Sequence, residues 1–367
     1  MRGWMWTLSL VEIVVVGGLL FVLPRIGRRG LLFGVYVGEE RSDSPAARAA
    51  TRRWSVGMGL TIAGCALLLL VLNAAGAPPA AFSLVVLPLV AGFAGSYLAA
   101  HRKARTLAAA TSARAVAVLG GDELRASTLP WLTILLAIGA GVGAALNALA
   151  HFDSLPERIP THLDLAGRPD RFADKSLVPL LLLPALAMFL GASLGGFALL
   201  TLAAKTSLRQ KADVASARAQ HQFRRAVARL LCGLALLVTA LLCYESSNQL
   251  RIVRGLAGAP GWITIALVVA ILGATLGSVI RLMARYGQGG ARLEGDSAAA
   301  ALSDGLADNR SWKLGLFYVN REDPSILLEK RFGFGYTINL GNPLALVILG
   351  GFFAILFGIV ALAIAAA

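Results

Sequence analysis

The feature that most constrains this chain is a series of apolar runs, each close to 20 residues long and nearly free of charge. A helix of that length crosses roughly 30 Å of hydrocarbon. Apolar side chains make up 57% of the 367 residues, which agrees with a membrane protein. We predict an all-α polytopic membrane protein with about eight transmembrane helices, at residues 4–23, 55–72, 80–100, 129–150, 177–204, 230–247, 262–284 and 343–363.

The basic residues are concentrated in alternate loops. Most of the 34 Lys and Arg residues lie in segments 24–54, 101–128, 205–229 and 281–331. Cytoplasmic loops of membrane proteins carry an excess of Lys and Arg, so we expect these segments in the cytoplasm and both termini outside it. Membrane orientation therefore accounts for the net charge of +14. We do not expect nucleic acid as a partner.

Composition divides the chain into four regions: an N-terminal membrane region with three helices and basic loops (1–128), a helical pair with a polar loop between its members (129–204), a second helical hairpin (205–284), and a β-rich cytoplasmic segment followed by the last helix (285–367). The β-prone stretch LLFGVYVGEE at 31–40 is similar to LGLFYVNRED at 314–323. We expect these two stretches to form β-structure against one another.

The polar loop at 151–176 reads HFDSLPERIPTHLDLAGRPDRFADKS and lies between two apolar runs. Its prolines exclude a continuous helix, and Gly167 could supply a turn with positive φ. Such a turn would let His162, Asp164 and Asp170 converge. We place this loop on the extracytoplasmic side, as the most favourable place for function.

Three interpretations of the loop stay open at this point. His162 and Asp164 could ligate a metal such as zinc, although the HxD spacing is a weak signal. The loop could instead contact a peptide or small ligand, or its polar groups could form a structural cap, with Asp174 or Ser176 capping the next helix. The ligand-binding candidates are His162, Asp164, Asp170, Lys175 and, from the outer end of the sixth predicted helix, Glu245 and Asn248.

Other polar residues are less informative. Glu12 lies near the middle of the first predicted helix, where a carboxylate is costly and is either a proton or cation site or a hydrogen-bonded packing residue. His101 falls in a basic loop, where we expect a solvated side chain. The chain contains no P-loop or HExxH motif, so we predict no enzyme activity and no cofactor.

Two stretches resemble a known family. The polar loop follows the pattern LPxxIPxH, GxxD, K[ST] and is similar to the signature of the bacterial SdpI-type immunity membrane proteins. The family often has Asn where this chain has Asp164. The pattern falls on Leu155, Pro156, Ile159, Pro160, His162, Gly167, Asp170, Lys175 and Ser176. Residues 308–343 resemble a second uncharacterised domain that often follows the first, with Trp312, Lys313, Tyr318, Lys330 and Arg331 as candidate residues of a cytoplasmic module.

The resemblance implies a multi-pass protein of the bacterial inner membrane with a non-enzymatic receptor, immunity or signal-transducing role. Its expected partners are the lipid bilayer, an extracytoplasmic peptide or envelope ligand, and a cytoplasmic regulator protein. A transporter or channel is the alternative, because Glu12, Glu245 and proline-kinked helices suit one. A membrane metalloenzyme resting on His162 and its neighbouring aspartates is the lesser alternative.

Overall fold

The computed structural model is mostly helical. Among the residues it describes, six helices are long and apolar enough to cross a membrane: α3 (Pro45–Ala74), α7 (Leu129–Ala150), α8 (Leu177–Ala203), α9 (Val214–Val253), α10 (Gly261–Tyr286) and α12 (Pro343–Ala365). The chain is thus a multi-pass membrane protein. The structure describes all residues except 1, 26, 28–29, 79–80, 83, 110–114, 119–126, 164–166, 205, 210–213, 294–305, 307 and 366–367.

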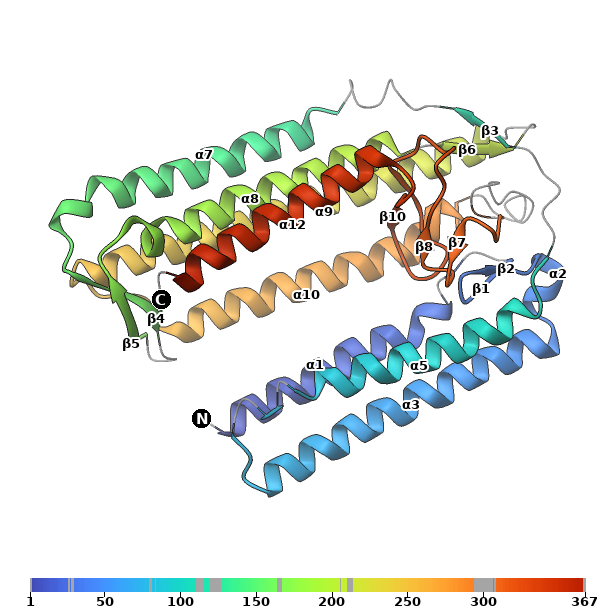
Figure 1. Ribbon diagram of the computed structural model, residues 1–367, viewed down its shortest axis with the longest axis horizontal. Helices are drawn as coiled ribbons and strands as arrows, with labels where there is room; N and C mark the ends of the chain where they lie inside the picture. Colours follow the sequence, from blue (N-terminus) through green and yellow to red (C-terminus); the bar gives the residue numbers. More distant parts are fainter. Residues whose placement is uncertain are drawn as a thin grey trace.

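Two further helices, α1 (Arg2–Val22) and α5 (Val86–Arg105), lie beside α3 (Figure 1). Helix α5 is displaced by about five residues towards the basic end relative to the predicted span 80–100. Pro88 explains the shift, because a proline is tolerated in the first turn of a helix but disrupts its interior. Eight crossings therefore stay a prediction, with α1 and α5 as the two helices that would complete them.

The helices form two bundles. Helices α1, α3 and α5 make one, and α7, α8, α9, α10 and α12 make the other (Figure 1). Small residues let the helices approach closely. A Cβ on Gly57 of α3 would lie 2.5 Å from Oγ of Ser96 on α5, and one on Gly191 of α8 would lie 2.5 Å from Cβ of Ala137 on α7. The N-terminal bundle has its own core around Trp54.

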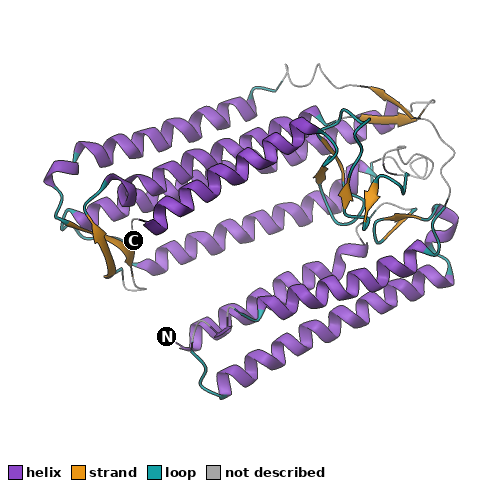
Figure 2. Cartoon of the chain, viewed as in Figure 1, coloured by secondary structure: helices purple, strands orange, loops and turns teal. Residues whose placement is uncertain are grey.

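The strands lie at the two ends of the helices (Figure 2). Each described sheet is an antiparallel pair. One hairpin, β4 (Arg158–Leu163) with β5 (Pro169–Asp174), occupies one end. The opposite end holds β1 (Leu31–Leu32), β2 (Val35–Tyr36), β3 (Ala115–Val118), β6 (Thr206–Arg209), β7 (Trp312–Lys313), β8 (Phe317–Tyr318), β9 (Leu327–Glu329) and β10 (Tyr336–Ile338).

Short helical turns connect these elements: α2 (Glu39–Ser42), η1 (Leu23–Arg25), η2 (Phe152–Ser154) and η3 (Gln288–Gly290). The four basic segments all reach the strand-rich end, opposite the β4–β5 hairpin (Figure 1). The fold therefore separates the two polar regions in the way that the charge pattern requires. Which end faces the cytoplasm stays a prediction.

The expected pairing between residues 31–40 and 314–323 is wrong in detail. Each stretch folds back on itself, so that β1 pairs with β2 and β7 pairs with β8. The reason is a left-handed turn in each, at Phe33–Gly34 and at Leu314–Gly315, where all four residues have positive φ. The two stretches do touch, but through these turns.

Candidate functional site

The β4–β5 hairpin rests on the link between α9 and α10. Gly167 has φ +78°, which confirms the left-handed turn expected there. A Cβ at this position would lie 2.9 Å from the carbonyl oxygen of Ala259 and 3.3 Å from Cα of Pro260. Only glycine fits both the backbone angle and the space, so Gly167 sets where the hairpin meets the rest of the protein.

Lys175 closes the base of the hairpin. Its Nζ donates to the carbonyl oxygens of Asp153 at 3.2 Å and Leu155 at 2.9 Å, and lies 5.2 Å from the ring centroid of Phe152. These contacts fix the chain between α7 and β4. Ser176 occupies the N-cap position of α8, but its side chain makes no capping bond. A ligand-binding role for Lys175 stays a prediction.

The C-terminal part of α9 is held to its surroundings by three polar side chains, those of Glu245, Asn248 and Gln249. Glu245 Oε1 accepts from the Thr264 hydroxyl at 2.6 Å. Asn248, which is buried, accepts from the backbone N–H of Ala259 at 2.7 Å. Gln249 Nε2 donates to the carbonyl oxygen of Pro160 on β4 at 3.0 Å. Asn248 and Glu245 thus connect α9 to α10 and its preceding link, and Gln249 connects α9 to the hairpin.

One side of the hairpin is packed and the other is open. Leu155 and Ile159 of the sequence signature are buried in a cluster with α8 and α9. Pro160 is also buried, whereas Pro156 is exposed. Along β5, every residue except Ala173 is exposed, and this strand carries Asp170, Arg171 and Phe172. The Phe172 ring is 43% exposed and lies 5.8 Å from the Arg158 guanidinium.

The metal hypothesis is not tested by this structure. His162 pairs with Arg171 in the β ladder, but its side chain and the whole of Asp164 lie outside the described residues. Elsewhere in the described chain, no group of three His, Cys, Asp or Glu side chains could hold a metal ion. Glu12 is exposed on the surface of α1, and its role also stays a prediction.

The opposite end contains a second built site, which we call the turn junction: Phe33, Gly34, Leu314 and Gly315. A Cβ on Gly34 would lie 2.4 Å from the carbonyl oxygen of Gly315, and one on Gly315 would lie 2.7 Å from Cα of Gly34. The β1–β2 and β7–β8 hairpins therefore meet turn against turn, at a distance that only two glycines allow. This contact joins parts of the chain that are about 280 residues apart.

Side chains of helix α5 form hydrogen bonds with the inward-facing carbonyl groups of both turns. The Tyr97 hydroxyl lies 3.1 Å from the carbonyl oxygen of Phe33 and 2.8 Å from that of Leu314. His101 Nδ1 lies 2.8 Å from the Phe33 oxygen, so this nitrogen carries the proton and donates. The expectation of a solvated His101 is wrong, because the ring is buried against the junction.

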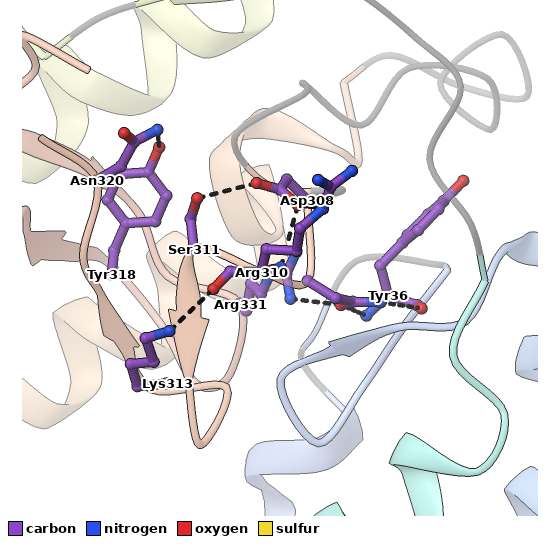
Figure 3. A network of polar contacts seen from close by, with 9 residues as sticks. Tyr36, Asp308, Arg310, Ser311, Lys313, Tyr318, Asn320 and Arg331 are labelled. Carbon is purple, nitrogen blue, oxygen red and sulfur yellow. Dashed lines mark hydrogen bonds and ion pairs between the residues drawn. The ribbon is translucent and has the colours of Figure 1, made fainter. Parts of the chain in front are cut away.

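Arg331 completes the junction from the C-terminal side (Figure 3). Its Nη1 donates to the Gly34 carbonyl oxygen at 3.1 Å and to Asn309 Oδ1 at 2.8 Å, and the guanidinium lies 5.0 Å from the Trp312 ring centroid. The side chain is 2% exposed, and Nε and Nη2 have no partner among the described residues. Burial lowers the pKa of Arg331 to about 9, against the opposing effect of Asp308.

The remaining module residues separate into buried and exposed positions. Trp312 and Tyr318 are buried and in ring contact at 5.2 Å, and the Tyr318 hydroxyl donates to Asp323 Oδ2 at 3.0 Å. Burial raises the pKa of Tyr318. Lys313 is exposed, and burial lowers the pKa of the half-buried Lys330.

The segment after Arg331 enters both bundles. The Phe332 ring lies 4.8 Å from the Tyr97 ring and within 6 Å of the Phe33 and Trp54 rings, in the N-terminal bundle. The Phe334 ring lies 5.5 Å from Phe223 on α9, in the other bundle. The module at 308–342 thus bridges the bundles through two aromatic side chains that are two positions apart.

Sequence reasoning missed the polar residues that hold the junction and the neighbouring module: Tyr97, His101, Gln288 and Asn309. The Gln288 amide donates to the carbonyl oxygen of Gly335 and accepts from its backbone N–H. The Asn309 amide forms the same pair of hydrogen bonds with the backbone of Tyr36. The available signal was the pair of similar stretches with an FG or LG dipeptide. Two turns with inward carbonyl groups need donors, but nothing in the sequence says which side chains supply them.

Two parts of the chain match domains that carry no known function. Residues 138–188, which include the β4–β5 hairpin and the adjoining parts of α7 and α8, match a domain of unknown function, DUF1648. Residues 321–346, which include β9, β10 and the start of α12, match a family of unknown function, DUF5808. No curated protein and no solved structure gives a significant match. The first match contains the β4–β5 hairpin, and the second contains Arg331 but not the turns of the junction.

Proposed function

We propose that the protein is a non-enzymatic membrane receptor of the immunity or signal-transducing type. In this proposal the β4–β5 hairpin contacts an extracytoplasmic peptide or envelope ligand. The module at 308–342 faces the cytoplasm, where it holds or releases a regulator protein. The SdpI-like signature and the absence of a P-loop or HExxH motif support this role, and both are properties of the sequence.

The hairpin has the form of a binding surface. Its base is fixed by Gly167, Lys175 and Gln249, while β5 presents an exposed strand edge with Asp170, Arg171 and Phe172. A peptide can add to such an edge through main-chain hydrogen bonds, and alternate side chains then give specificity. An aromatic ring between charged groups also suits an amphipathic peptide.

The observation that carries the proposal is that one helix joins the two ends. Helix α9 contains 40 residues, which corresponds to about 60 Å. Gln249 near its C-terminal end binds the hairpin, and Phe223 near its N-terminal end packs against Phe334 of the module. A displacement of the hairpin by a ligand would therefore be transmitted along a rigid element to the module.

The test uses a strain from which the gene is deleted. We expect this strain to be killed by secreted antimicrobial peptides at concentrations that the parent survives. Complementation with the wild-type gene should restore survival, whereas Asp170→Ala and Phe172→Ala should not. Phe317→Ala is the matched control, since Phe317 is an equally exposed ring on the β7–β8 hairpin at the other end.

Expression levels of all variants would be compared in membrane fractions. Unchanged peptide sensitivity in the deletion strain would remove immunity from consideration. Loss of protection in Phe317→Ala together with full protection in Phe172→Ala would move the ligand to the opposite end of the molecule.

A further inference from the structure

The N-terminal bundle carries a group of exposed cations at the strand-rich end. We call this group the basic collar: Arg48, Arg52 and Arg53 in the first three turns of α3, and Arg102 and Arg105 at the end of α5. The two helices run antiparallel, with Gly57 packed on Ser96 and Thr61 on Gly92. Because of this pairing, the cations of both helices lie at the same level.

The collar continues the lipid-facing surface of α3. Arg53 is followed on the same helix face by Val56 and Leu60, which are 53% and 70% exposed, and then by Leu67 and Val71. This i, i+3, i+7 spacing is that of one helical face. The guanidinium of Arg53 therefore lies one turn beyond an outward apolar stripe, at the level where the phosphates of a bilayer begin.

Neither α3 nor α5 contains an acidic residue, so the collar is not neutralised within its own helices. Helix stability does not explain Arg48 either, because cations in the first turn oppose the helix dipole. Arg48 Nη1 donates to a neutral carbonyl group, that of Asp43, at 2.7 Å. Three acidic residues precede α3, at Glu39, Glu40 and Asp43, so the five guanidinium groups outnumber them, and lipid phosphate can supply the complementary charge.

We propose that the basic collar binds the phosphate headgroups of anionic lipids while the apolar stripe on α3 contacts their acyl chains. This inference is independent of the role of the β4–β5 hairpin. Each cation near an anionic surface strengthens lipid binding roughly fivefold. The collar would thus fix the N-terminal bundle in the headgroup layer beside the turn junction.

The experiment measures lipids bound to the detergent-purified full-length protein by native mass spectrometry. The probes are phosphatidylglycerol and phosphatidylcholine of the same acyl composition. We expect the wild type to retain phosphatidylglycerol in preference to phosphatidylcholine, and less of it as NaCl is raised, because salt screens the interaction. The triple variant R52Q/R53Q/R102Q should bind phosphatidylglycerol on the order of 100-fold more weakly.

Two further variants make the result specific. R310Q/K313Q/R321Q removes three exposed cations from the module at the same end, away from the apolar stripe, and should bind lipid like the wild type. R52K/R53K/R102K keeps the charge and should keep the preference, which separates loss of charge from faulty folding. Equal binding of both lipids by the wild type, or an equal loss in the module variant, would overturn the proposal; the first of these results would leave an acidic protein as the collar's partner.

Discussion

The two polar ends of the molecule differ in how far their strands are buried. At the hairpin end, a pair of strands is attached to one bundle by a few side-chain bonds to backbone carbonyl groups, and β5 stays exposed. At the strand-rich end, two turns meet through glycines and are enclosed by Tyr97, His101 and Arg331. Both ends bind backbone carbonyl groups with side-chain donors, but only one of them does so in a buried core.

If the hairpin binds a ligand as we propose, this difference separates a stabilising end from a recognition end. The junction and the aromatic rings beside it join two bundles whose helices, in the described part of the chain, pack mainly within their own bundle. Buried polar networks of this kind are costly when disrupted, because each lost partner leaves a desolvated group. The exposed hairpin carries no such penalty. We expect substitutions to lose stability at the junction and to change activity at the hairpin.

The largest loss is expected for Gly34→Ala. The alanine would have to adopt the backbone angle of Gly34, φ +76°, which is strained for any residue with a side chain. Its methyl group would also overlap the backbone of Gly315. The backbone strain and the steric overlap together should lower the free energy of unfolding by about 3 kcal/mol or more. Thermal unfolding of the purified protein in detergent measures this loss.

Gly196→Ala is the control for that substitution. Gly196 lies inside α8, where an added Cβ meets no atom within 4 Å, and alanine favours the helix. We expect unchanged or slightly higher stability. If both variants unfolded at the wild-type temperature, the two turns could not be in the close contact described here.

A smaller loss is expected for Tyr97→Phe. The substitution keeps the ring contact with Phe332 and removes only the hydroxyl that reaches the Phe33 and Leu314 carbonyl groups. One lost hydrogen bond with a buried, unsatisfied acceptor corresponds to about 1–2 kcal/mol. Tyr244→Phe, on a half-buried residue of α9, should change stability less. Equal melting temperatures for the two variants would contradict a structural role of the hydroxyl.

The membrane helices could be predicted from the sequence because a helix that crosses the bilayer needs about 20 apolar residues in a row. The sequence also offered Gly167 as a residue that could supply a turn with positive φ, and the structure has such a turn there. The separation of the polar loop from the basic segments followed from charge alone. These features depend on local composition and on the membrane, and not on long-range contacts.

The turn junction could not be predicted in the same way. His101 lies beside several cations in the sequence, which suggests solvent exposure, yet its ring is covered by a hairpin from residues 31–36. Arg331 lies in a basic stretch and is nevertheless buried. The burial of both side chains results from hydrogen bonds to residues that are 68 or more positions away in the sequence. These bonds form only when the two glycine turns pack against each other.

At the hairpin end, Gln249→Ala should have a modest effect. It removes the donor that binds the carbonyl groups of Pro160 and Pro179, and this should cost about 1 kcal/mol. We expect faster amide hydrogen exchange in β4, with little change in the N-terminal bundle. Gln222→Ala, on an exposed residue of α9, is the control. Exchange that changed equally in both variants would mean that Gln249 does not hold the hairpin.

The smallest change in stability is expected for Phe172→Ala. The ring is 43% exposed and its contact with Arg158 is a cation–π pair at 5.8 Å, so its removal should cost less than about 0.5 kcal/mol. Phe317→Ala, at 49% exposure on the other end, should be equally mild. A melting temperature of Phe172→Ala as low as that of Gly34→Ala would show that β5 is part of a core, and the distinction between a recognition end and a structural end would then fail.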